Sequence, residues 1–304
     1  MRSAALFFCV TVGGLASVSW GQGFKRMEAS ASGDTLICVT WNQREVLYRV
    51  DAAGSSKTPG EAEFTAIDAA FATWQSRVSS CSDFIFTRGE RVTNPVVGNG
   101  GPTGENALTF RETSCAALTD PCVADGSCAN TFHCWEHSDT TVALTTVTFS
   151  KRTGVVYDGD IEFNAAPHFD GTSFLFTTIS NPPCVTGMES ANCTAWDVQN
   201  TATHEIGHLL GFDHVDEPDS TMAPTADIGD TQKRIIDNGT LDGFCLTYPR
   251  GQAPVPCDEL ASKRRQLIGT NTGTFGCACT SLNWGEGTLL LLALIGFMSR
   301  RKSC

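Results

Sequence analysis

Apolar residues recur at helical spacing in two stretches of the chain. The first follows Thr58-Pro59-Gly60-Glu61, where a capping Thr, a Pro at the first helical position and a Glu at the third predict a helix start. The second follows the capping-box pattern Thr194-Ala195-Trp196-Asp197 and ends at Gly211. The apolar stripes are Phe64, Ile67, Phe71, Trp74 and Val78 in the first, and Val198, Ala202, Ile206, Leu209 and Leu210 in the second. We therefore expect two long amphipathic helices.

Strand patterns surround the first helix and lie between the two helices. Residues 45–50 and 84–87 flank the first helix, so a strand–helix–strand unit is expected. Residues 141–150 and 155–164 are rich in β-branched residues, and Lys151-Arg152-Thr153-Gly154 between them is a hairpin signal with Gly in the loop. These elements predict an α+β domain with a mixed sheet.

The rest of the domain comprises one irregular stretch and two short helical segments. Residues from about 91 to 139 are rich in Gly, Asn and Cys and too long for a simple connection, so we expect an insertion held by its own disulfides. Two shorter helical segments are expected at 231–237, before Asn238-Gly239, and at 241–248, before Pro249.

Both ends of the chain carry the features of targeting signals. Residues 1–21 place Arg2 before an apolar run and end in small residues, which is the order of a secretory signal peptide. Near the other end, Cys277 and Cys279, the apolar run 289–298 and a terminal basic cluster together resemble the C-terminal sorting signals of exported myxobacterial proteins. A simple membrane anchor is the alternative, because hydropathy does not separate the two and the run is shorter than the ~20 residues of a stable span.

The expected organisation follows from these boundaries. It comprises a signal peptide at 1–21, one folded domain at 22–255, a linker with the Cys motif at 256–280 and a sorting or anchor signal at 281–304.

Composition narrows the classes of function and the compartment. The 304 residues carry 21 Lys plus Arg against 33 Asp plus Glu, a net charge of −12, without the clustered basic residues that nucleic acid requires. Hydrophobic residues at 41% suffice for a packed core, and 14 cysteines indicate an oxidising compartment. We therefore expect a monomer with no nucleic-acid partner and only transient membrane association. Its expected location is extracellular or on the outer surface of a Gram-negative, myxobacterial-like cell.

Ten cysteines lie between the two signals, enough for five disulfides. Local spacing suggests Cys184 with Cys193 and Cys245 with Cys257, and Cys38 could pair with Cys81 or another cysteine, although spacing leaves the connectivity open. A second zinc site is disfavoured, because the spacings of its four cysteines miss the pattern of structural zinc. Its members would be Cys115, Cys122, Cys128 and Cys134 with His133 and His137.

The second helix carries the residues of a metal site. His204 and His208 lie four positions apart, so both rings project from one face of the helix, opposite the apolar stripe. Glu205 can reach a water on the metal without being a ligand. Gly211 permits the left-handed turn that ends the helix, after which His214 can return as a third ligand. Three protein ligands leave a fourth position open, as in catalytic zinc sites.

With Gly211 and His214 in place, the sequence resembles the metzincin metallopeptidases, closest to the matrixins. The resemblance also rests on the upstream segment Gly159-Asp160-Ile161-Glu162-Phe163-Asn164 and on Ser220-Thr221-Met222-Ala223-Pro224, in which Met222 would form the turn under the metal. It implies a zincin-like α+β fold with a twisted mixed five-stranded sheet, two long helices and a small C-terminal helical subdomain. Val215 departs from the Ser that matrixins usually have there, and no Pro-Arg-Cys-Gly segment is present.

The resemblance implies a zinc-dependent endopeptidase. In this function Glu205 is the general base, and one catalytic zinc is held by His204, His208 and His214. The substrate would be a protein or peptide in extended form on an edge strand, for which 141–150 is the candidate. The alternative is a non-catalytic zinc-containing surface binding or adhesion module. Retention of the general base favours the enzyme.

Two further roles are open at this point. Asp158, Asp160 and Asp170 could bind calcium, as matrixins do, or could be solvated turn carboxylates. Cys38 could be a latency thiolate on the zinc or a member of a plain disulfide.

Overall fold

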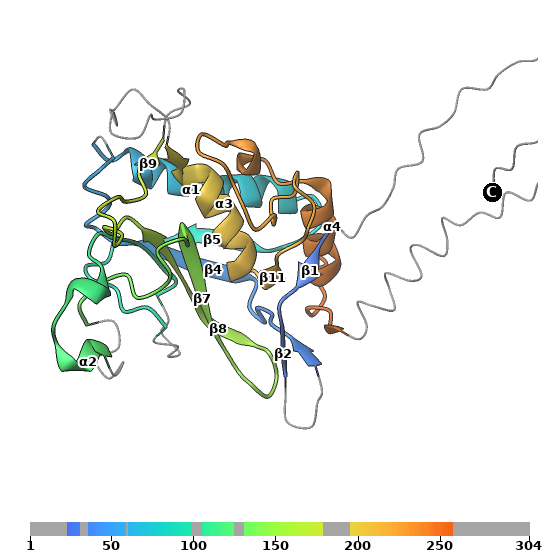
Figure 1. Cartoon of the computed structure of the whole chain (residues 1–304). Helices are drawn as coiled ribbons and strands as arrows, with labels where there is room; N and C mark the ends of the chain where they lie inside the picture. The colour runs from blue at the N-terminus through green and yellow to red at the C-terminus, as the bar shows by residue number, and fades with distance from the viewer. Residues whose placement is uncertain are drawn as a thin grey trace, which may run out of the picture. The chain divides into compact units, whose positions relative to one another are not determined.

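The computed structural model describes residues 23–30, 36–58, 60–98, 105–124, 131–178 and 195–257 (Figure 1). The chain divides into two units, 1–264 and 265–304, and every described residue lies in the first. The expected signal peptide, the Cys184–Cys193 pair and the C-terminal sorting signal lie outside the described residues. No helix within the described ranges is long and apolar enough to cross a membrane.

A mixed five-stranded sheet organises the first unit, and its strand order is β5-β4-β6-β8-β7. The strands are β4 (Glu45–Val50), β5 (Ile85–Arg88), β6 (Ala107–Arg111), β7 (Ala143–Phe149) and β8 (Val156–Asn164). The first four in this order run parallel, and β7 pairs antiparallel with β8. The expected mixed sheet and hairpin are confirmed, and β7 lies at one edge.

Strand β6 corrects the expectation that 91–139 is wholly an insertion. Ala107–Arg111 is buried along its whole length, between β4 and β8. A strand covered on both faces loses the alternation of polar and apolar residues that signals a strand in sequence. The remainder of the stretch contains a 3-10 turn (Cys115–Ala117) and the short helix α2 (Pro121–Ala124).

A buried ion-pair cluster fastens this Cys-containing segment to the sheet. The Arg111 guanidinium donates to Glu162 Oε1 at 2.5 Å, and His137 Nε2 lies 3.5 Å from Glu162 Oε2. On β8, Gly159 lies against Leu209 of the second long helix, whereas Glu162 points to the opposite face because side chains alternate along a strand. The segment therefore covers the sheet face away from the helices.

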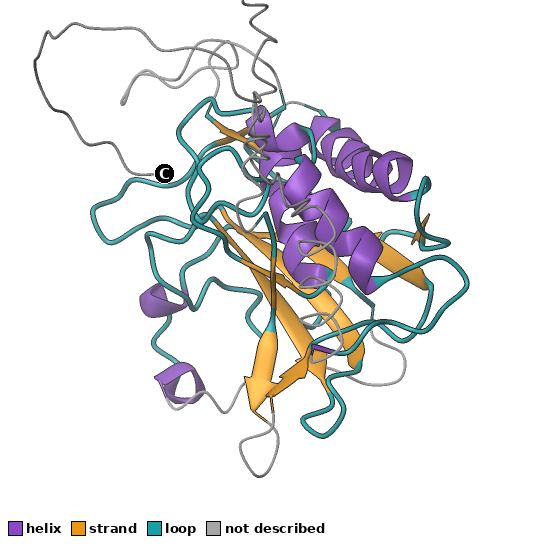
Figure 2. Ribbon diagram, turned by 90° about the vertical axis from the view of Figure 1, so that its right-hand side faces the viewer, coloured by secondary structure: helices purple, strands orange, loops and turns teal. Residues whose placement is uncertain are grey.

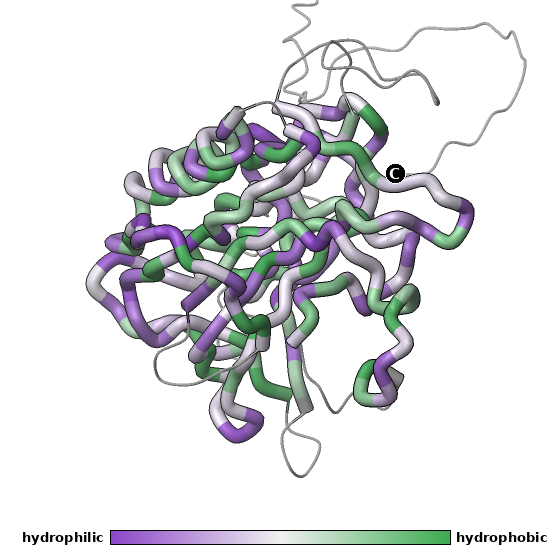
Figure 3. The backbone as a smooth tube through the Cα atoms, turned by 90° about the vertical axis from the view of Figure 1, so that its left-hand side faces the viewer, coloured by the Kyte–Doolittle hydropathy of each residue, from purple (hydrophilic) through white to green (hydrophobic). Residues whose placement is uncertain are grey.

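Helices α1 (Ala62–Val78) and α3 (Val198–Leu209) pack against each other and against the sheet (Figure 2). Trp74 is fully buried between them, and its indole Nε1 donates to the Thr203 carbonyl at 2.9 Å. Figure 3 shows hydrophobic and hydrophilic residues interspersed along the backbone of the described ranges. The two long helices predicted from apolar spacing are confirmed.

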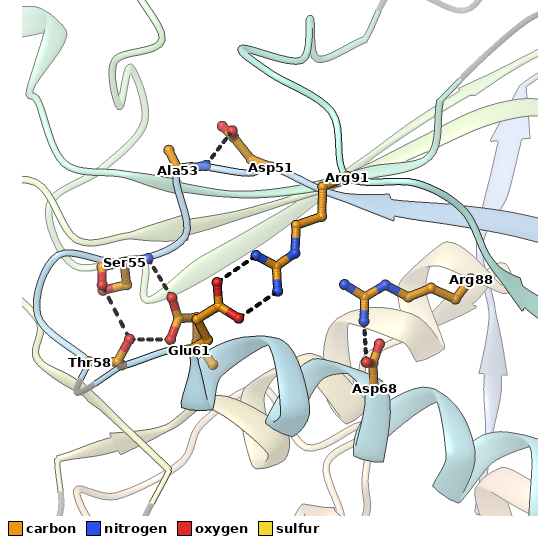
Figure 4. Close-up of polar contacts among 9 residues, drawn as sticks. Asp51, Ala53, Ser55, Thr58, Glu61, Asp68, Arg88 and Arg91 are labelled. Atoms are coloured by element: carbon orange, nitrogen blue, oxygen red, sulfur yellow. Dashed lines mark hydrogen bonds and ion pairs between the residues drawn. The ribbon is translucent and has the colours of Figure 1, made fainter.

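Both helices begin later than their sequence signals indicate. Gly60 has a φ of +65°, which is outside helical geometry, so α1 starts at Ala62 instead of Pro59. The Thr58 hydroxyl and the Ser55 N–H donate to the Glu63 carboxylate, and a nearby ion pair joins Glu61 to Arg91 (Figure 4). These contacts fix the turn that precedes the helix.

The N-cap of α3 also differs from the capping-box prediction. The side chain of Asp197 accepts the Asn200 N–H at 2.7 Å and is the N-cap, whereas Thr194 lies outside the described residues. Because α3 starts at Val198, Asp197 is the residue directly before the helix, and its carboxylate can accept a free N–H of the first turn. Thr194 is three positions further from the helix start.

The two C-terminal helical segments differ in their bounds from those expected at 231–237 and 241–248. A 3-10 turn, η2, spans Gln232–Arg234, and helix α4 spans Asn238–Thr247. The prediction that Asn238-Gly239 stops a helix is wrong, because Asp237 caps α4 by accepting the Thr240 N–H at 3.0 Å. The described residues also form three short strand pairs: β1 (Lys25–Arg26) with β11 (Phe212–Asp213), β2 (Glu28–Ser30) with β3 (Leu36–Cys38), and β9 (Phe176–Thr177) with β10 (Trp196–Asp197).

Three disulfides connect the described residues: Cys38–Cys257, Cys81–Cys245 and Cys115–Cys134. Cys122 is disulfide-bonded as well. The expectation of disulfides is confirmed, but the Cys245–Cys257 pair is wrong, because α4 brings Cys245 to the end of α1 and the chain after α4 brings Cys257 to β3. The disulfide of Cys38 excludes a latency thiolate, and the Cys115–Cys134 bond excludes the second zinc site.

Candidate metal centre

Three histidine nitrogens converge at the end of α3. The Nε2 atoms of His204 and His208 are 3.2 Å apart, those of His204 and His214 are 3.2 Å apart, and those of His208 and His214 are 3.1 Å apart. The structure therefore brings together all three histidines that the sequence singled out as ligands, and their ligand atoms form a nearly equilateral triangle.

Backbone carbonyls fix the orientation of two of the rings. The Nδ1 atom of His204 lies 2.7 Å from the Thr221 carbonyl oxygen, and that of His208 lies 2.7 Å from the Phe212 carbonyl oxygen. Because a carbonyl only accepts, each Nδ1 carries the proton and each Nε2 presents a lone pair. Burial lowers the pKa of His204, His208 and His214, which favours the neutral rings that bind metals.

The donor set fits a zinc ion. Zinc bound by imidazole nitrogens at about 2.0–2.1 Å in tetrahedral geometry separates the nitrogens by roughly 3.3–3.4 Å, close to the observed triangle. One other group of candidate ligands is close together in the described part of the chain, Glu28 with Cys38 and Cys257, but both cysteines are in a disulfide. The histidine triangle is therefore the candidate metal centre.

A tight turn returns His214 to the helix. Gly211 has a φ of +85°, the left-handed conformation that glycine adopts without strain, and it is followed by β11. The Met27 N–H donates to the Gly211 carbonyl at 2.8 Å, and the buried Arg26 guanidinium donates to the same oxygen at 3.2 Å. The N-terminal strand β1 thus holds the segment that carries the third histidine.

The turn containing Met222 lies directly beneath the histidines. Met222 is fully buried, its sulfur lies against Gly207 of α3, and its carbonyl accepts the Val215 N–H at 3.1 Å. The preceding residue, Thr221, provides the carbonyl that orients His204. The structure therefore places Met222 where the resemblance implied.

Glu205 is buried beside the three histidines and is held by the edge strand. The Thr145 hydroxyl of β7 lies 2.7 Å from Glu205 Oε2, to which it donates. Burial raises the pKa of the Glu205 carboxyl to about 7. Thr145 escaped the sequence reasoning, because a threonine in a β-rich stretch has no spacing that marks it as a site residue.

A cavity of about 600 Å³ opens next to this group. It is lined by the three histidines and Glu205, by residues 140–145 at and just before the start of β7, and by residues 224–226 after the Met222 turn. The other lining residues are Met27, Trp196, Asn200, Thr201, Asp213 and Lys233. The cavity therefore extends along the free edge of the sheet, beside the strand that the sequence proposed for a peptide.

The three aspartates considered for calcium do not come together in the described residues. Asp158 and Asp160 are buried on β8 and are not solvated turn carboxylates; Asp160 accepts the backbone N–H groups of Gly98 and Ala107. Burial, and next the neighbouring Asp158, raise the pKa of Asp160 to about 7. Asp170 is exposed on a loop, where it accepts from Thr172.

Comparison with known proteins agrees with this architecture. A family model described as Matrixin matches residues 106–244, which run from the start of β6 into α4 and include the three histidines, Glu205 and Met222. No curated protein matches the chain. Together with the mixed sheet and helices, the match shows that the chain has the α+β metzincin fold and contains a region similar to the matrixin domain.

Proposed function

We propose that this protein is an exported zinc endopeptidase that cleaves extended peptides through a Glu general base. The observation that carries the proposal is the position of Glu205, buried at the wall of the cavity beside three converging histidine nitrogens. His204, His208 and His214 would hold the zinc. Zinc, when bound, supplies the Lewis acidity that activates water and polarises the scissile carbonyl.

Glu205 performs the proton transfers in this mechanism. Its carboxylate takes a proton from the attacking water as the hydroxide oxygen bonds to the carbonyl carbon, and then delivers that proton to the leaving nitrogen as the C–N bond breaks. The Thr145 hydroxyl fixes the carboxylate by its hydrogen bond to Oε2. Burial raises the pKa of this carboxyl to about 7 in the metal-free protein, because the surroundings disfavour the charged form, and a desolvated carboxylate is a stronger base than an exposed one.

The substrate in this proposal adds a strand to the sheet. β7 is the terminal strand of the order β5-β4-β6-β8-β7, and its first residues border the cavity. A free edge offers backbone N–H and C=O groups to an extended peptide regardless of its side chains. The hydrogen bond between Thr145 and Glu205 joins this edge to the catalytic group.

Export and display on or release from the outer cell surface are part of the proposal. The support is the set of disulfides, because cytosolic reductants keep thiols reduced. The same proposal includes a monomeric protein, transient membrane association through the C-terminal signal, and calcium as a second bound ion.

The test is replacement of the general base. Glu205→Gln should lower peptidase activity at least about a hundredfold while zinc content stays near one per chain, since general acid–base catalysis typically contributes 10²–10⁴-fold. Glu90→Gln, an exposed residue outside the cavity, is the matched control and should retain activity. A wild-type protein with full zinc that cleaves no peptide of a broad library would refute the enzyme and favour a binding module.

A further inference from the structure

One wall of the cavity carries a buried cation. Lys233, on η2, is 3% exposed, and its Nζ donates to the Ala223 carbonyl at 2.5 Å. In the described ranges of the chain, no carboxylate oxygen lies within 4.0 Å of this Nζ, so its charge has no direct counter-ion there. Burial lowers the pKa of Lys233 to about 8, which leaves the ammonium largely protonated at neutral pH.

Asn200 adds a second donor to the same wall. The side chain is 2% exposed, and its Oδ1 accepts the Lys233 backbone N–H at 2.7 Å. Its NH₂ makes no hydrogen bond among the residues that the structure describes, and it is not one of the buried polar atoms without a partner, so it keeps some solvent exposure. Asn200 and Lys233 thus add N–H donors to a cavity whose walls also carry the carboxylates of Glu205 and Asp213.

Such a wall is complementary to a carboxylate. A buried ammonium bonded only to a carbonyl loses most of the hydration it had in the unfolded chain, and the carboxylates of Asp230 and Glu205 act on it only at longer range. An Asp or Glu side chain entering the cavity would accept from both groups and would form charge-assisted hydrogen bonds, which are stronger than neutral ones. An aliphatic side chain would leave the donors unsatisfied.

The cavity also lies next to the position of bond cleavage. Thr145, which binds Glu205, marks that position on β7, and residues 140–144 extend from it along the cavity. A peptide antiparallel to β7 runs toward the start of the strand, so the residue after the cleaved bond enters the cavity. We propose that this cavity selects substrates with an acidic side chain, Asp or Glu, next to the scissile bond, through Lys233 and Asn200. This inference rests on the proposed peptidase function.

The test uses the full-length zinc-loaded protein and quenched fluorescent peptides. One series varies only the residue after the cleaved bond among Glu, Gln and Leu, and a second series varies only the residue before it. Wild type should cleave a Glu peptide with a kcat/KM at least about tenfold above its Gln counterpart, equivalent to about 1.4 kcal/mol. Because Glu and Gln have nearly the same shape, the ratio reports charge.

The variant Lys233→Gln keeps an N–H for the Ala223 carbonyl and removes the charge. It should bring the Glu-to-Gln ratio close to one, whereas Lys151→Gln, in the exposed β7–β8 turn, should leave the wild-type ratio unchanged. The inference is overturned by a wild-type ratio near one in the series that varies the residue after the cleaved bond, whatever the other series gives and even if the variant does not fold. It is also overturned if Lys233→Gln slows all peptides equally, because the lysine would then act on Glu205. Zinc-loaded wild type that cleaves no peptide would instead refute the peptidase itself.

Discussion

Replacing Arg26 should both destabilise the domain and weaken its metal centre. The guanidinium is buried and makes three hydrogen bonds, to the Gly211 carbonyl at 3.2 Å, the Val39 carbonyl at 2.7 Å and the Thr247 hydroxyl at 2.8 Å. It thereby joins the turn before His214 to β3 and α4. No sequence pattern marks this role.

The size of the effect follows from these three contacts. Each hydrogen bond from a charged donor contributes about 1.5–3 kcal/mol, and a buried carbonyl that loses its partner costs about 1–3 kcal/mol. Contributions within one cluster are not additive, so Arg26→Met should lower the free energy of unfolding by about 4 kcal/mol. For a domain of this size that corresponds to a Tm about 8–16 °C lower.

The assay compares Arg26→Met with Lys25→Met. Lys25 is the neighbouring residue of β1, and its ion pair with Asp213 is solvent-exposed, so its loss should cost at most about 1 kcal/mol. Urea unfolding of the metal-free proteins measures stability, and competition with a zinc chelator measures metal affinity. Arg26→Met with a loss below about 1 kcal/mol and wild-type zinc affinity would refute the reasoning.

Two further predictions concern Thr145 and the aspartate pair on β8. Thr145→Val removes the hydrogen bond to Glu205 and should lower kcat/KM about tenfold in a peptide-cleavage assay, with zinc content unchanged. Thr145→Ser keeps a hydroxyl at this position and should therefore retain most of the wild-type kcat/KM. Folding raises the pKa of Asp160 from 3.8 to about 7, so the folded state binds this proton more tightly than the unfolded state does. The free energy of unfolding therefore falls as the pH rises from about 4 to about 7, and each pKa unit of difference corresponds to about 1.4 kcal/mol. Asp158→Asn removes the neighbouring carboxylate, so the loss of unfolding free energy between pH 5 and pH 7.5, measured by urea titration, should be smaller than in wild type. An identical loss in the two proteins would show that Asp158 does not raise the pKa of Asp160.

Local patterns in the sequence were sufficient for part of the fold and the site. Strand 45–50 was predicted with its exact bounds, and the hairpin and both long helices were found, because each is encoded by neighbouring residues. The three histidines and Glu205 stood out for the same reason, since their spacing on one helix and one turn defines the site.

Features that depend on distant residues were missed. β6 has no alternation because both its faces are covered, and the disulfide partners of Cys245 and Cys257 lie 164 and 219 residues away. Thr145 and Lys233 are common residue types that acquire a role only when β7 and η2 meet α3 at the cavity. Such positions carry no signal until the chain is folded.

The Cys38–Cys257 disulfide also determines how the protein responds to mechanical force. It covalently joins residues 219 positions apart and so closes a loop that contains the five-stranded sheet, α1, α3, α4 and the three histidines. Tension applied between the two ends of the chain passes from Cys257 through the sulfur atoms to Cys38. Residues 39–256 are therefore not extended while the bond is intact. β1 lies outside the loop, so the contacts of Arg26 and Met27 with the Gly211 carbonyl are the part of the metal centre that such tension reaches.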